Sequence, residues 1–425
     1  MVFGTIKLSK IRMTFGIEYS IIEIVDSKGG CKKETAMQDF VYYTPTKVYF
    51  GKGKHKEVGA IIKGYGYTKI MLQYGQGSIK KNGLYHEIMD SLKASGIEVV
   101  EMGGVEPNPK IAFVREAVKL AKEEKVQLIL AVGGGSVIDS CKYTAAGAVN
   151  DCDPWDFPTR KSVATKALPI GCVLTLAAAG SEMSSSAVIT NPELNMKRGF
   201  NSDTNRCLFA ICNPEFTYTV NKYQTACGIV DIMAHTMERY FTVCEPTDLT
   251  DRIAESLLKS VVDAGKVLME NPCDYEARAT MMWASSLSHN DLTGCGRENA
   301  LAVHQLEHAL SGEFDRIAHG AGLAVLFPAW ARYVYQYNIS RFAQFARRVW
   351  EVTESDDEKA AILGIERMAE YFASLKMPVR LRDFGIPEDC MDKLAKLCTF
   401  GKQRSVKSYV DMDYDVIKGI FESCY

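Results

Sequence analysis

Residues that could bind a metal are concentrated in the second half of the chain. Asp231 and His235 are four residues apart, and His304 and His308 have the same spacing. Side chains four apart lie on one face of a helix, so each pair would point toward a shared position. An aspartate with two or three imidazoles, counting His319, suits a divalent ion such as Fe²⁺ or Zn²⁺. We therefore expect one divalent metal ion in this half.

A lone histidine is more often a hydrogen-bonded core residue than a ligand. Here four of the seven histidines fall in two clusters with an aspartate in register, which favours a metal site. Cys227, Cys244 and Cys295 have no partner at zinc-finger or zinc-ribbon spacing, so we interpret them as packing residues.

A glycine-rich loop in the first half is typical of phosphate binding. The apolar run Gln127–Val132 is followed directly by Gly133-Gly134-Gly135-Ser136 and then by a helical pattern. Glycines let the backbone approach an anion, which unpaired N–H groups and the helix dipole stabilise. We expect Ser136 to cap this helix and Asp139, in its first turn, to hold a ribose or amide group.

A second loop of the same kind is Tyr74-Gly75-Gln76-Gly77-Ser78, at the end of an apolar run. Either loop alone is a weak signal, because many glycine turns are only turns. Two such loops favour a dinucleotide, with Gly75, Gly77 and Ser78 among its contacts.

The elements that would position these residues fall into two groups. From about 40 to 215, predicted strands alternate with predicted helices, which is typical of a parallel sheet covered on both faces. The strands are Lys69–Gln73, Glu98–Met102, Gln127–Val132 and Ala167–Leu174, and the helices are Tyr85–Ser95 and Ile111–Glu124. After Pro214 the pattern is helical, over Asp251–Asn271, Tyr275–Ser288, Glu298–Ser311, Arg341–Glu351 and Glu388–Cys398.

These groups predict two domains in a chain of 425 residues, which is too long for one ordinary core. Residues 37–215 would form a dinucleotide-binding α/β domain, and residues 216–425 a helical metal-binding domain. Residues 1–36 are an N-terminal extension assigned to neither.

Composition excludes several classes of function. The formal charge of -2 gives no broad attraction for nucleic acid or an anionic membrane. The 13 cysteines are scattered without a CxxC pair, as expected of reduced thiols in a cytoplasm. Glu18 and Glu23 interrupt the N-terminal apolar segment, and no run approaches the ~20 apolar residues that span a bilayer. We expect a cytoplasmic protein without nucleic-acid or membrane partners.

Taken together, the motifs resemble the iron-containing alcohol dehydrogenase family, and within it the butanol dehydrogenase-like aldehyde reductases that use NADPH. The resemblance covers about residues 38–425 and includes Thr175 with Gly180-Ser181-Glu182. It implies a Rossmann-like N-terminal α/β domain with an all-α C-terminal domain, the dehydroquinate synthase-like fold. It also implies a homodimer.

The resemblance also implies roles for individual residues. The metal ligands would be Asp231, His235, His304 and His319, and His308 would lie beside the nicotinamide without binding the metal. The cofactor contacts would be Gly134, Gly135 and Ser136 at the pyrophosphate and Thr175, Ser184 and Lys197 along the rest. Ala179 replaces a usual threonine and Asn213 a usual aspartate; neither belongs to the metal set, so we expect these two departures to affect cofactor affinity more than activity.

The implied reaction interconverts primary alcohols and aldehydes of the butanol and butyraldehyde type. A divalent ion would lower the pKa of the alcohol or polarise the carbonyl, and His308 would relay the proton. Two alternatives share the fold: a glycerol dehydrogenase-like polyol dehydrogenase and a dehydroquinate synthase-like lyase. The lyase needs several converging basic residues, and the stretch His304–Gly322 offers only Arg316. A non-catalytic nucleotide-binding module ranks last, because the metal set is intact.

The glycine loop after the predicted strand Lys69–Gln73 also predicts which nicotinamide cofactor is preferred. A carboxylate at the end of such a strand binds the ribose 2′-hydroxyl and repels a 2′-phosphate. Residues 74–81 contain no Asp or Glu, whereas Ser78, Lys80 and Lys81 could favour the phosphate. We therefore expect NADP(H) to be preferred over NAD(H).

Overall fold

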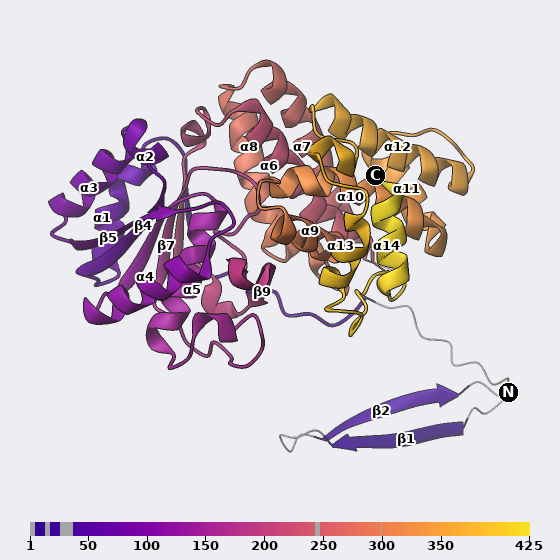
Figure 1. Ribbon diagram of the computed structural model, residues 1–425, viewed down its shortest axis with the longest axis horizontal. Helices are drawn as coiled ribbons and strands as arrows, with labels where there is room; N and C mark the ends of the chain where they lie inside the picture. Colours follow the sequence, from indigo (N-terminus) through magenta and orange to yellow (C-terminus); the bar gives the residue numbers. More distant parts are fainter. Residues whose placement is uncertain (1–4, 13–17, 26–36, 243–246, 299) are drawn as a thin grey trace.

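The computed structural model describes residues 5–12, 18–25, 37–242, 247–298 and 300–425. Within the predicted extension, β1 (Thr5–Arg12) and β2 (Glu18–Val25) pair antiparallel, and the rest of 1–36 lies outside the described residues. From residue 37 onward, a sheet domain lies beside a larger helical domain (Figure 1). No helix in the described ranges is both long and apolar enough to cross a membrane.

The first domain is built on one parallel sheet of six strands in the order β3-β10-β7-β6-β4-β5. Their bounds are β3 Lys47–Phe50, β4 Lys69–Gly75, β5 Glu98–Val105, β6 Leu128–Gly133, β7 Ile170–Leu174 and β10 Phe209–Cys212. A hairpin of β8 (Ser186–Asn191) and β9 (Met196–Asn201) stands apart from this sheet.

Helices cover both faces of the sheet because its central strands are apolar on both sides. Ile70 and Leu72 of β4 pack in one cluster with α1 and α3, whereas Met71 faces the opposite cluster with α4 and α5. The helices are α1 Val58–Gly64, α2 Ser78–Lys81, α3 Leu84–Ala94, α4 Ile111–Glu123 and α5 Gly135–Val149. The predicted strand Ala167–Leu174 begins only at Ile170, since Pro169 has no N–H to join the ladder.

The second domain is helical. Its long helices are α6 Lys222–Tyr240, α7 Asp248–Glu270, α8 Tyr275–His289, α9 Ala302–Glu313, α10 His319–Val334, α11 Ile339–Val349, α12 Asp357–Ser374, α13 Cys390–Cys398 and α14 Tyr414–Ser423. Nearly every residue of α6 is buried, so this helix lies at the domain's centre. The predicted helix Glu298–Ser311 begins only at Ala302, because Leu301 has a left-handed backbone with φ 45°. The predicted fold class is confirmed.

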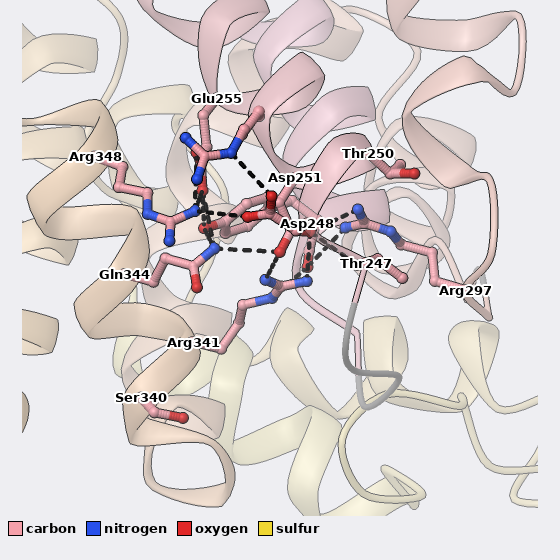
Figure 2. Close-up of polar contacts among 12 residues, drawn as sticks. Thr247, Asp248, Thr250, Asp251, Glu255, Arg297, Ser340, Arg341, Gln344 and Arg348 are labelled. Carbon is pink, nitrogen blue, oxygen red and sulfur yellow. Dashed lines mark hydrogen bonds and ion pairs between the residues drawn. The ribbon is translucent and has the colours of Figure 1, made fainter. Parts of the chain in front are cut away.

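A buried charge cluster ties the carboxyl end of α6 to its neighbours (Figure 2). Asp251 of α7 accepts hydrogen bonds from Arg297 Nη2 at 2.6 Å and from both terminal nitrogens of Arg341 at 2.5 and 2.8 Å. Arg297 also donates to the carbonyl of Arg239 at 3.2 Å, and Arg341 to that of Tyr240 at 3.1 Å. The two arginines therefore join the end of α6, the first turns of α7, the approach to α9 and helix α11.

Replacing Asp251 with alanine should destabilise the protein strongly, because both buried guanidinium groups lose their shared carboxylate. Breaking a buried ion pair costs about 3–5 kcal/mol. Denaturant unfolding measures the change. The matched control is Asp248→Ala, at an exposed carboxylate one turn earlier, which should unfold like the wild type. Equal stability of the two variants would contradict this role of Asp251.

Candidate metal and nucleotide site

The structure brings the four predicted metal-binding side chains together from three helices. Asp231 and His235 come from α6, His304 from α9, and His319 is the first residue of α10. Asp231 Oδ1 lies 3.5 Å from His235 Nε2, 3.6 Å from His304 Nε2 and 3.7 Å from His319 Nε2. Four potential donor atoms thus surround one small volume.

Two of these donor atoms are buried without a hydrogen-bond partner among the described residues: Asp231 Oδ1 and His304 Nε2. A buried polar atom without a partner is costly, and most find one. A divalent cation would satisfy both atoms, and one carboxylate with three imidazoles is a donor set that Fe²⁺ or Zn²⁺ accepts. The residues present therefore fit the metal.

Close packing of backbone brings the ligand-bearing helices together. A Cβ on Gly320, beside His319, would lie 2.1 Å from the carbonyl oxygen of Cys227 on α6. A Cβ on Gly228 of α6 would lie 2.4 Å from the carbonyl oxygen of Ala177, in the loop after β7. Only glycine permits these contacts, which hold α6 against both α10 and the sheet domain.

Two buried carboxylates hold the outer nitrogens of two of these imidazoles. Glu238 contacts His304 Nδ1, and Glu307 contacts His319 Nδ1. Such partners fix the orientation of metal-binding histidines and raise their basicity. The prediction from sequence missed both glutamates, although each lies on the same helix face as a predicted ligand, seven residues after Asp231 and three after His304.

Neighbouring charges shift the pKa values of Glu307 and His304 in the direction opposite to the effect of burial. Burial opposes ionisation of Glu307, but His319 and Lys197 outweigh it and lower the pKa of Glu307 to about 2. Burial likewise opposes protonation of His304, yet Glu238 and Asp231 raise the pKa of His304 to about 9. A metal ion would therefore compete with a proton for His304.

A further histidine, His289, lies at the same place. It is the last residue of α8, and its Nδ1 is 2.7 Å from His235 Nδ1 and 3.0 Å from His235 Nε2. Burial lowers the pKa of His289 well below the usual histidine value. No pattern in the sequence indicates His289, because it has no partner at helical spacing and becomes a neighbour of His235 only through tertiary packing.

His308 lies beside the four donors. It follows His304 by one turn of α9, and its ring centroid is 5.6 Å from that of His319. Burial and then the Lys197 ammonium lower the pKa of His308 well below the usual value. Burial and the nearby positive charge therefore favour the neutral form of the His308 imidazole.

The predicted nucleotide loops meet at one edge of the sheet. Strands β4, β6 and β7 are parallel neighbours, so the loops after their carboxyl ends adjoin. These loops contain Gly75, Gly77 and Ser78 after β4, Gly134, Gly135 and Ser136 after β6, and Thr175 after β7.

One prediction for these loops is wrong. Helix α5 begins at Gly135 with Gly134 as its N-cap, so Ser136 is the second residue of the helix and does not cap it. Asp139 consequently falls beyond the first turn. A Cβ on Gly133 would lie 2.5 Å from the Val137 side chain, so this turn requires glycine.

Three predicted cofactor residues have their polar groups engaged within the protein. Asp139 accepts from Ser181 Oγ at 2.6 Å and from the Val188 N–H at 2.9 Å. The other two are Ser184, whose Oγ accepts from the buried Lys142 at 3.3 Å, and Lys197, which donates to Ser311 at 3.0 Å and lies 3.7 Å from Glu307. The first two brace the loop before β8, and Lys197 links the β8–β9 hairpin to α9.

Ala179 and Asn213 are the two positions that depart from the family pattern, and the structure shows what each contacts. The Cβ of Ala179 would lie 3.7 Å from a Cβ on Gly135, which places Ala179 against the first turn of α5. Asn213 accepts from the N–H of Glu215 at 3.1 Å, a capping bond that an aspartate would also make.

Comparison with known proteins agrees with this geometry. The iron-containing alcohol dehydrogenase model matches residues 45–214, and the C-terminal model of the Fe-containing alcohol dehydrogenase family matches residues 225–425. NADH-dependent butanol dehydrogenase A of Clostridium acetobutylicum is 42% identical over 391 residues, covering 92% of this chain and 100% of the relative. NADPH-dependent aldehyde reductase YqhD of Escherichia coli is 35% identical over 390 residues, covering 91% of this chain and 100% of the relative.

A solved structure shows the same likeness. The crystal structure of NADH-dependent butanol dehydrogenase A from Thermotoga maritima superposes with a TM-score of 0.89 at 40% identity, over 91% of this chain and 99% of that chain. With both domains matched and the four donor side chains converged, the chain belongs to the iron-containing alcohol dehydrogenase family.

Proposed function

We propose that this protein is a metal-dependent oxidoreductase that transfers a hydride between a nicotinamide cofactor and a primary alcohol or aldehyde of the butanol type. The observation that carries the proposal is the unsatisfied Asp231 Oδ1 among three imidazoles. The substrate class is supported by the names of the relatives, which include butanol dehydrogenases and an aldehyde reductase.

Different residues of this protein would bind the metal, bind the dinucleotide and transfer the proton. The ligands Asp231, His235, His304 and His319 would hold the ion, which when bound acts as a Lewis acid toward an alcohol or carbonyl oxygen. The glycine loops after β4 and β6 would bind the dinucleotide through backbone N–H groups. The neutral His308 would accept the alcohol proton, or return it in the reducing direction.

The alternatives have less support. A lyase acting on an anionic sugar acid needs converging basic side chains, but Arg316 is exposed and donates to the carbonyl of Phe384 at 2.9 Å. A polyol dehydrogenase would use the same metal centre, and only substrate kinetics separates it from the proposed activity.

The described cysteines are unpaired, as in an enzyme of the reducing cytoplasm. The expected homodimer stays a prediction, which the mass of the protein in solution would test.

The preference for NADP(H) is also proposed. The loop after β4 carries no carboxylate, and Lys80 Nζ lies over the rings of Tyr74 and Tyr85 at 4.9 and 4.7 Å. Glu101 of the neighbouring strand β5 accepts from both tyrosine hydroxyls, at 3.0 and 2.7 Å, and its charge helps to raise the pKa of Lys80. This carboxylate lies outside the loop sequence on which the prediction rested. Among the relatives, the butanol dehydrogenases are named for NADH and the E. coli reductase for NADPH.

The first test concerns the metal. Replacing Asp231 with asparagine removes the ligand charge, so metal content measured by elemental analysis should fall from about one ion per chain to a small fraction of that. His86→Asn, at an exposed histidine of α3, is the control and should retain the ion. Full metal content in the Asp231 variant would show that the ion binds elsewhere.

The second test concerns proton transfer. His308→Ala should lower kcat by about 10²–10⁴, the usual contribution of a general acid or base, while metal content stays at the wild-type value. Steady-state kinetics and elemental analysis on one preparation measure both. If the ion is lost together with activity, His308 is a ligand and the assignment is wrong.

The third test concerns the cofactor. With one aldehyde, kcat/KM should be higher for NADPH than for NADH, and Lys80→Met should reduce the NADPH value more than the NADH value. Lys81→Met, at the exposed neighbouring residue, is the matched control. A wild-type kcat/KM with NADH equal to or above that with NADPH would overturn the proposed preference.

A further inference from the structure

We propose that Asp291 is a positioning residue for hydride transfer: its carboxylate joins the two domains through two arginines close to the proposed ligand His235. The inference rests on the proposed function and adds to it a residue outside the metal and nucleotide sets. Asp291 follows helix α8 and belongs to the helical domain. The two arginines are Arg206, just before β10 in the sheet domain, and Arg239 of α6.

Arg206 connects three segments of the chain. Its side chain is only 5% exposed, and each of its three nitrogens donates to a different acceptor. Nη2 donates to Asp291 Oδ2 at 2.6 Å, Nη1 to the carbonyl of Met183 at 3.0 Å and Nε to Asp203 at 3.1 Å. Met183 belongs to the loop after β7, directly after Gly180-Ser181-Glu182. Arg206 therefore ties this loop to the helical domain, and Asp291 is the acceptor on the helical side.

Arg239 lies on α6, one turn after His235. It is buried, and its Nη1 donates to the carbonyl of His235 at 2.9 Å. Its Nη2 lies 3.9 Å from Asp291 Oδ1, and its Nε has no hydrogen-bond partner among the described residues. A buried guanidinium is unfavourable unless a carboxylate lies nearby, so Asp291 offsets the charge of Arg239. The Asp291 carboxylate thus lies between the helix that carries two proposed ligands and an arginine of the sheet domain.

The backbone of Asp291 is strained. Its φ is 72°, in the left-handed region that glycine adopts freely and that is uncommon for other residues. Asp291 precedes the short helix Leu292–Gly294, but its side chain makes no capping hydrogen bond to that helix. Strained residues persist where surrounding contacts hold them, and they cluster at functional sites. The carboxylate therefore serves the two arginines and not the turn in which it lies.

The link has a consequence for the proposed reaction. The sheet domain would bind the nicotinamide cofactor, and the helical domain the metal and the alcohol. Hydride transfer needs the reacting atoms about 3–3.5 Å apart, and a misplacement of about 1 Å can slow such a step about 10²-fold. Arg206 holds the loop after β7, whereas Arg239 holds the backbone of α6 at His235. Asp291 joins the two arginines and so limits how far the cofactor and the metal can move apart.

The test measures hydride transfer directly in the metal-loaded, full-length protein. The complex with oxidised cofactor is mixed rapidly with 1-butanol, and the first turnover is followed by the absorbance of reduced nicotinamide. Asp291→Asn keeps a residue that tolerates the left-handed backbone but removes the charge, so the transfer rate should fall about 10–100-fold while metal content stays at the wild-type value. Butanol deuterated at C1 should react more slowly in every variant, which identifies the measured step as hydride transfer.

Two further variants separate positioning from stability. Asp291→Gly relieves the backbone strain and removes the carboxylate, so it should unfold in denaturant no more easily than Asp291→Asn and yet transfer hydride no faster. Asp203→Asn is the matched control. It changes an exposed carboxylate that also accepts from Arg206 but lies within the sheet domain, so the transfer rate should stay at the wild-type value.

A wild-type transfer rate in either Asp291 variant would overturn the inference. An equal loss of rate in Asp203→Asn would also overturn it, because the effect would then come from Arg206 and not from the link between the domains. Loss of the metal in Asp291→Asn would show that the residue acts on metal binding instead. Failure of the proposed function is distinguishable, since the wild-type protein itself would then form no reduced cofactor from 1-butanol.

Discussion

The arrangement of the helices depends on the burial of one carboxylate oxygen, Asp231 Oδ1. Asp231 Oδ1 is buried among three imidazole nitrogens at 3.5–3.7 Å, beyond hydrogen-bond distance, and no described group donates to it. A buried anionic oxygen without a partner is strongly unfavourable unless a cation joins it. The helices that create this arrangement must therefore be held by other contacts, and a bound cation would offset part of the unfavourable burial of Asp231.

Those contacts are mostly backbone against backbone. Gly320 brings the start of α10 onto α6, and Gly228 brings α6 onto the loop after β7. At the far end of α6, Arg297 and Arg341 bind its last carbonyl groups and share Asp251. The same helix thus carries two of the proposed metal ligands, contacts the loop after β7 and is anchored at its end.

Prediction from sequence succeeded where the signal was local. The spacing of Asp231 and His235 is a property of one helix, and the strand–helix alternation before residue 215 is enough to predict a parallel sheet. It failed where tertiary packing decides. Glu238, Glu307 and His289 become neighbours of the ligands only when α6, α8, α9 and α10 pack, and the left-handed backbone of Leu301 shortens a helix whose composition would extend further. Glu101 comes from the strand beside the loop that it influences, so inspection of the loop alone could not find it.

The most direct test of this account is anomalous diffraction from crystals of the metal-loaded protein, measured at the absorption edge of Fe or Zn. The account predicts one strong peak per chain, about 2.0–2.2 Å from Asp231 Oδ1 and from the Nε2 atoms of His235, His304 and His319. Glu307, His308 and His319 also have ligand atoms within 4.8 Å of one another. A peak at that group, or none at Asp231, would contradict the account.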